Sequence, residues 1–186
     1  MGKKNYAIAV CGSAGGVISQ EISTRAYDIG KNIAKNGCTL FTGATVGYTL
    51  DAVRGAHEAR GMTVGISPAE SWQDQQKRFE PIDPSLYTVI IYTGVGYKMR
   101  DVVLLRSVVA ALFIGGGVGT LLELTVAIDY RKTIGILADS GGATDLREKI
   151  ALISHRTKPQ YIVAADPKLL VASIVQTLQR RPHGRP

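Results

Sequence analysis

Four short glycine-rich segments are the parts of this sequence whose residue types most directly indicate chemistry. They cover residues 12–16 (GSAGG), 42–47 (TGATVG), 93–96 (TGVG) and 115–120 (GGGVGT). Glycine lets main-chain N–H groups approach a ligand closely, and such groups at the start of a helix bind phosphate. Each segment alone is also explained by a tight strand-to-helix turn, but the four together favour a site for a phosphate-bearing small molecule. The predicted binding residues are Gly12, Ser13, Gly15, Gly16, Gly43, Thr45, Gly94, Gly116, Gly117, Gly119 and Thr120.

Short apolar runs that precede these segments predict the strands that would position them. We expect strands near residues 6–11, 38–42, 63–67, 88–92, 109–114, 133–137 and 161–164, and helices near 19–36, 49–60, 98–106, 120–131, 145–153 and 167–180. This alternation is typical of a parallel sheet covered on both faces. The predicted fold class is therefore α/β, a Rossmann-like doubly wound sheet of about seven mainly parallel strands. Ligands of such sheets bind beyond the carboxyl ends of the strands, where the glycine-rich segments lie.

The rest of the chain adds little to this single sheet. We predict one domain over residues 1–180 and a short basic tail over residues 181–186. Residues 68–86 are polar and contain two prolines, so we expect a loop or lid over the site there. Met62 and Met99 are expected to fill the core.

Two common nucleotide motifs are absent from the glycine-rich segments. No Gly-Lys-Ser/Thr follows Gly119, which argues against a triphosphate-hydrolysing P-loop. The spacing of Gly115, Gly117 and Gly119 is not G-x-G-x-x-G, and Thr42 and Gly43 stand where a dinucleotide site usually has a ribose-binding carboxylate. Redox use of NAD is therefore disfavoured.

Residues 114–123 (IGGGVGTLLE) resemble the P-G-G-x-G-T-x-x-E signature of the LOG family, proteins of the SLOG superfamily long labelled "lysine decarboxylase-like". Residues 10–16 and 42–47 resemble the other two loops of that family. Known members cleave the N-glycosidic bond of nucleoside 5′-monophosphates, which releases the base and ribose 5-phosphate. They form dimers or larger assemblies, so the resemblance implies a homodimer or homotetramer here.

The resemblance also implies that Glu123 and Arg100 are a catalytic pair. In that role the carboxylate stabilises an oxocarbenium-like ribose or orients water, and the guanidinium holds the phosphate or the departing base. We expect Arg100 to open the helix after the fourth strand and Glu123 to open the next helix, with neighbouring strands bringing them together. Two simpler explanations stay open: Thr120 and Glu123 fit a capping box, and Arg100 fits an exposed position on an amphipathic helix.

Two departures from the family pattern bear on activity. Asp101 stands where the enzymes of the family usually have lysine, and Gly115 replaces the proline of the signature. Both changes resemble a divergent branch that is also similar to molybdenum cofactor carrier proteins, which bind a pterin phosphate without cleaving it. The sequence therefore leaves two hypotheses: a nucleotide-binding phosphoribohydrolase, or a non-catalytic carrier or sensor of a nucleotide or molybdenum cofactor.

No cofactor is expected to be required, beyond a bound nucleotide or molybdopterin-type ligand. A PLP-dependent decarboxylase is disfavoured, because no lysine falls within the glycine-rich segments. We expect no metal site and reduced thiols, since Cys11 and Cys38 are far apart and each lies beside an apolar run; this favours the cytoplasm. The longest apolar run, residues 108–114, is too short to span a membrane.

The net charge of +7 comes mostly from the two ends of the chain. The terminal basic residues are Lys3, Lys4, Arg180, Arg181 and Arg185. The body of the chain is close to balanced and carries no basic stripe with interleaved aromatic residues, so nucleic acid is not an expected partner.

Overall fold

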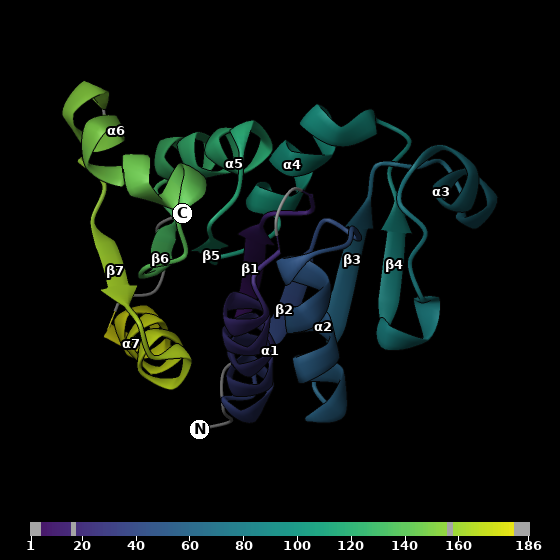
Figure 1. The fold of residues 1–186 in the computed structure, drawn as a ribbon, viewed down its shortest axis with the longest axis horizontal. Coiled ribbons are helices and arrows are strands. Elements are labelled where there is room, and N and C mark those ends of the chain that lie inside the picture. Colours follow the sequence, from purple (N-terminus) through teal and green to yellow (C-terminus); the bar gives the residue numbers. More distant parts are fainter. Residues whose placement is uncertain (1–4, 16–17, 156–157, 181–186) are drawn as a thin grey trace.

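A sheet of seven parallel strands forms the centre of the fold (Figure 1). The structure is a computed structural model that describes residues 5–15, 18–155 and 158–180. The strands are β1 (Ala7–Gly12), β2 (Thr39–Thr42), β3 (Thr63–Ser67), β4 (Val89–Tyr92), β5 (Ala110–Ile114), β6 (Thr133–Leu137) and β7 (Tyr161–Ala164). The helices are α1 (Gln20–Lys35), α2 (Tyr48–Glu58), α3 (Trp72–Arg78), α4 (Gly96–Arg106), α5 (Val118–Asp129), α6 (Arg147–Ile153) and α7 (Pro167–Arg180).

The strand order β4-β3-β2-β1-β5-β6-β7 is that of a doubly wound sheet. Every pair of neighbouring strands is parallel, and β1 lies between β2 and β5. The chain therefore moves outward from β1 in one direction as far as β4 and then resumes at β5 on the other side of β1. The predicted fold class, a Rossmann-like α/β sheet of seven strands, is confirmed.

Helices cover both faces of the sheet and divide the core into two layers (Figure 1). Side chains of β1 alternate between them: Ile8 and Val10 pack with α1, α2 and α7, whereas Ala9 and Cys11 pack with α4, α5 and α6. Successive strand residues point to opposite faces, so a strand buried on both sides is an uninterrupted apolar run. This burial explains why the sequence pattern located the central strands; the edge strands β4 and β7, which are partly exposed, were recognised from their short apolar runs.

The first helix follows directly from the spacing of its apolar residues. Ile22, Ala26, Ile29 and Ile33 recur at helical intervals and are all buried against the sheet. The helix ends just before Gly37, whose φ of +71° is the left-handed conformation that glycine adopts most easily.

The structure corrects several local expectations. Residues 68–86 contain helix α3, whose N-cap Ser71 accepts a hydrogen bond from the main-chain N–H of Asp74 at 3.2 Å, and a 3₁₀ turn follows. Propensity alone gave no sign of α3, because seven residues are too few for a clear periodic pattern. Met62 and Met99 are not core residues; they are 49% and 59% exposed.

No helix in the described part of the chain combines the length and the apolar character needed to cross a membrane.

Candidate functional site

The candidate site is a pocket that opens where β1 and β5 lie side by side, the point at which the strand order changes direction. Ser13, which follows β1, donates its main-chain N–H to the carbonyl of Ile114 at the end of β5 over 3.4 Å. Next to this contact lies a cavity of about 380 Å³, a volume typical of small-molecule sites. The loops after both strands therefore face one space, as expected for the ligand site of a doubly wound sheet.

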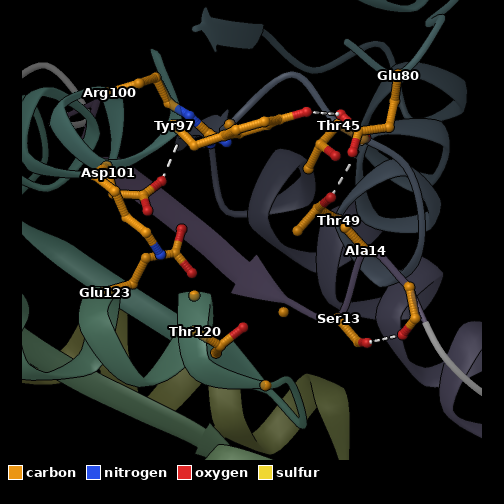
Figure 2. Close-up of a pocket in the computed structure, with 16 residues that line it drawn as sticks. Ser13, Ala14, Thr45, Thr49, Glu80, Tyr97, Arg100, Asp101, Thr120 and Glu123 are labelled. Atoms are coloured by element: carbon orange, nitrogen blue, oxygen red, sulfur yellow. Dashed lines mark hydrogen bonds and ion pairs between the residues drawn. The ribbon is translucent and has the colours of Figure 1, made fainter. Parts of the chain in front are cut away.

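Three of the four glycine-rich segments contribute to this pocket (Figure 2). The predicted residues that line it are Gly12, Ser13, Gly15, Gly43, Thr45, Arg100, Gly117, Gly119, Thr120 and Glu123. Gly94 does not line it and instead lies against the side chain of Glu70. Gly116 also lies outside the lining, behind Thr120, and Gly16 lies outside the described residues.

Arg100 and Glu123 do meet in the pocket, but by a different route from the expected one. Strand β4 is at the edge of the sheet, separated from β5 by three strands. Helix α4 returns from this edge toward β5 and packs beside α5, so adjacent helices bring the two side chains together. Both helices begin two residues earlier than expected, which places Arg100 and Glu123 in the second turn of each.

Arg100 is buried, so the alternative that it is an exposed helix residue is wrong. Its side chain occupies the space that a Cβ atom at Gly43 would fill. Its Nε atom lies 3.4 Å from Oδ1 of Asp101, an ion pair without hydrogen-bond geometry, and Nε has no hydrogen-bond partner among the described residues. A buried guanidinium is costly unless its charge is compensated, and Asp101 is its ion-pair partner among the described residues.

Glu123 is a buried acid rather than part of a capping box. The N-cap of α5 is Gly117, and Thr120 lies inside the helix without a side-chain capping bond, so the capping-box alternative is wrong. Burial and the neighbouring Asp101 carboxylate raise the pKa of Glu123 to about 8, against the opposing effects of Arg100 and a hydrogen bond from the Cys11 thiol. At neutral pH the protonated form predominates, so this carboxyl can donate a hydrogen bond.

Two neighbours complete the electrostatics around Glu123. Burial raises the pKa of Asp101, although Arg100 acts in the opposite direction. Burial and the Glu123 carboxylate raise the pKa of the Cys11 thiol. Cys11 is thus the buried, reduced core thiol that the sequence predicts, and it lies directly beneath the site.

Sequence reasoning missed several residues of the pocket. Lys98 lines it, although no lysine falls within the glycine-rich segments themselves. Lys98 and Tyr97 lie two and three residues before Arg100 on the first turn of α4, so their proximity to Arg100 was a usable signal. Glu80 and Thr49 also line the pocket, and Glu80 comes from the segment after α3, where no local pattern marks it.

No group of three histidine, cysteine or carboxylate residues with metal-binding geometry occurs in the described part of the chain. A ligand in the pocket would meet three kinds of group. These are the main-chain amides of the glycine-rich turns, the cations Lys98 and Arg100, and the acids Glu80, Asp101 and Glu123.

Comparison with known proteins agrees with this architecture. The molybdenum cofactor binding protein of Rippkaea orientalis is 26% identical, with 95% of this chain and 99% of that chain covered and a TM-score of 0.77. The molybdenum cofactor carrier protein of Chlamydomonas reinhardtii is also 26% identical, with 95% and 100% covered and a TM-score of 0.76. An uncharacterized protein of Archaeoglobus fulgidus is 28% identical over 122 residues, which are 66% of this chain and 74% of the relative.

A family model described as the SLOG cluster4 family matches residues 5–171, nearly the whole described chain. The glycine-rich motifs predicted a LOG-like protein, and Asp101 and Gly115 predicted a divergent branch. The chain belongs to such a branch, the SLOG cluster4 family.

Proposed function

We propose that this chain binds a phosphorylated small molecule of nucleotide or molybdopterin type and carries it without cleaving it. The observation that carries the proposal is the buried Arg100 guanidinium, which lines the same pocket as Lys98 and the start of α5. A helix N-terminus presents free N–H groups and a positive dipole end to an anion. Together these groups suit a phosphate.

The state of Glu123 favours carriage over cleavage. A carboxylate that stabilises an oxocarbenium-like ribose must be ionised, whereas burial and Asp101 raise the pKa of Glu123 to about 8. A lysine at position 101, as the resembled enzymes have, would act in the opposite direction and favour the carboxylate. The acid at this position therefore supports a binding role for Glu123, as a hydrogen-bond donor to the ligand.

The molybdenum cofactor proteins named above add support for the ligand class. Each aligns with 95% of this chain at 26% identity, and their names state that they bind or carry a molybdenum cofactor. A pterin phosphate has the same two parts as a nucleotide, a planar ring and an anion, and either would place its phosphate against the glycine-rich turns.

A second function, phosphoribohydrolase activity, is favoured by one specific observation: Arg100 and Glu123 line one pocket. In this case Glu123 would act as a general acid toward the departing base, a role that a pKa of about 8 permits. The two functions differ in whether free base is released.

The binding test uses purified protein and isothermal titration calorimetry with ribose 5-phosphate, AMP, GMP and molybdenum cofactor released anaerobically from a molybdoenzyme. We expect at least one of these to bind, and Arg100→Ala to weaken that binding about 10- to 100-fold through loss of a charge-assisted contact. Absence of binding by all four would overturn the proposal.

The cleavage test incubates the same protein with AMP and GMP and measures free base by chromatography. We expect none. Base release that disappears in Glu123→Ala and persists in Asp101→Ala would instead establish the hydrolase.

A further inference from the structure

Glu80 is a carboxylate that the tertiary structure holds firmly at the pocket wall. The Tyr97 hydroxyl donates to Oε2 of Glu80 at 2.8 Å, and the Tyr97 ring packs edge-to-face on Phe79 with centroids 5.2 Å apart. The main-chain carbonyl of Glu80 accepts a hydrogen bond of 2.6 Å from the fully buried Gln75. Hydrogen bonds therefore hold both the main chain and the carboxylate of this residue.

The hydroxyl that holds Glu80 stays protonated at neutral pH. Burial, followed by the hydrogen bond to Glu80, raises the pKa of Tyr97 to about 12. Because the hydroxyl only donates to Oε2, the other carboxylate oxygen and the remaining lone pairs stay available to a ligand. Within the described residues, no hydrogen bond or ion pair to Oε1 is present.

Glu80 lies on the opposite side of the pocket from the turns after β1 and β5. Figure 2 shows Glu80 and Thr45 across the pocket from Thr120 and Ser13, so the turn after β2 lies on the Glu80 side and the turns after β1 and β5 lie opposite. A carboxylate repels phosphate, so the ligand's anion is directed away from Glu80 and its other end toward it. The group that meets Glu80 must therefore supply hydrogen-bond donors.

We propose that Glu80 determines ring specificity by accepting hydrogen bonds from the adjacent ring N–H and exocyclic amino groups of a 2-amino-4-oxopyrimidine ring, the edge shared by guanine and pterin. Two neighbouring donors match a carboxylate, whereas adenine presents a ring acceptor beside its amino group and would place a lone pair against Glu80. This inference rests on the proposed function, since it names the ring class of the ligand bound at the same site.

The test compares GMP with AMP, two probes that differ only in the base, by calorimetry on the full chain. We expect GMP to bind at least about tenfold more tightly, the effect of charge-assisted hydrogen bonds. In Glu80→Gln the amide offers one acceptor and one donor, so the ratio of affinities falls toward one. In Tyr97→Phe the ring remains but the carboxylate is released, so the ratio falls by a smaller factor.

A matched control exists elsewhere in the fold. The Tyr27 hydroxyl donates to Oε2 of Glu58 at 2.7 Å, the same pairing, and neither residue lines the pocket. Glu58→Gln should therefore leave the ratio of GMP to AMP affinity unchanged.

The outcomes separate this inference from the proposed function. Equal binding of GMP and AMP, or a preference for GMP that survives Glu80→Gln, would overturn the role of Glu80 while the phosphate site stands. If GMP, AMP, ribose 5-phosphate and released molybdenum cofactor all fail to bind, the phosphate site and the ring inference both fail.

Discussion

The guanidinium of Arg100 occupies the space beside Gly43 where any other residue would place its side chain. Gly43 and Arg100 come from separate parts of the chain, and the size of each side chain is explained by the presence of the other. Gly43 belongs to the turn after β2, which is near the centre of the sheet, while Arg100 comes from a helix that starts at its edge. At this position the absence of a side chain, rather than a flexible backbone, is what the site requires.

Gly43→Ala is expected to displace the Arg100 guanidinium and weaken the binding of ribose 5-phosphate or a nucleotide about 10- to 100-fold. Calorimetry on the single and double variants measures the coupling between the two positions. In an Arg100→Ala background, Gly43→Ala should add almost nothing, because the group that it displaces is already gone. Additive losses would show that the glycine acts independently of Arg100.

The raised pKa of Glu123 predicts how the free energy of unfolding changes with pH. A folded-state pKa of about 8, above the ordinary value of 4.5, means that the folded chain holds a proton that the unfolded chain releases between these limits. The contribution of this proton to the free energy of unfolding is therefore fully present below about pH 4.5 and is lost as the pH rises through 8. The loss is on the order of 3–5 kcal/mol.

Urea unfolding of the parent and of Glu123→Gln between pH 5 and 9 tests whether the free energy of unfolding falls as the pH rises. We expect the parent to lose stability relative to Glu123→Gln as the pH rises, because glutamine has no proton to release. Asp101→Asn should reduce the slope by removing the charge that disfavours the Glu123 carboxylate. Parallel pH curves for the parent and Glu123→Gln would show that Glu123 titrates normally.

At the scale of elements, α1 and α2 cross with their backbones in close contact. A Cβ atom on Gly30 of α1 would collide with the carbonyl of Ala52, and one on Gly55 of α2 would collide with the carbonyl of Tyr27. The two glycines therefore permit each helix to approach the main chain of the other. This crossing fixes α2, whose first residue, Tyr48, donates its main-chain N–H to Ser13 at the pocket edge over 3.1 Å.

Gly30→Ala and Gly55→Ala are each expected to lower the free energy of unfolding by about 1–3 kcal/mol, because a backbone neighbour cannot move aside. Gly119→Ala is the matched comparison, since its added Cβ meets nothing within 4 Å and alanine favours a helix. Its free energy of unfolding should stay equal or rise. Denaturant unfolding of the three variants provides the measurement, and equal effects at all three positions would contradict the collision.

At the scale of the whole molecule, the direction change between β1 and β5 creates the site, and apolar side chains remain exposed around it. Met99 on α4 and Val118 on α5 are 59% and 78% exposed although their helices are adjacent. The apolar residues Leu104, Leu105 and Val108, in contrast, are buried in the core. Exposed apolar side chains on adjacent helices would be covered by an interface between subunits.

The chain is accordingly expected to form a homodimer or homotetramer. Sedimentation equilibrium should give a mass two or four times the 19.9 kDa of one chain. Met99→Glu should shift the distribution toward the monomer, because the charge would be buried in such an interface. A monomer at all concentrations tested would refute the expectation.

The sequence by itself determined the fold class, the strands and, with the exception of α3, the helices. Strands such as β5 are recognisable because both faces are buried and every residue is apolar, and the glycine-rich turns follow because a parallel sheet places them at one edge. Helix α1 is equally local, since its buried residues recur at helical spacing. These features depend only on residues close together in the chain.

Only the tertiary structure decided which residues share the pocket. Strand β4 lies at the far edge of the sheet, so the path of α4, not strand adjacency, brings Arg100 to Glu123. The segment after α3 brings Glu80 to the same space without any local pattern. The pKa of Glu123 likewise depends on burial and on Asp101 of another helix. Each of these results depends on contacts between residues distant in the chain, and periodicity carries no information about them.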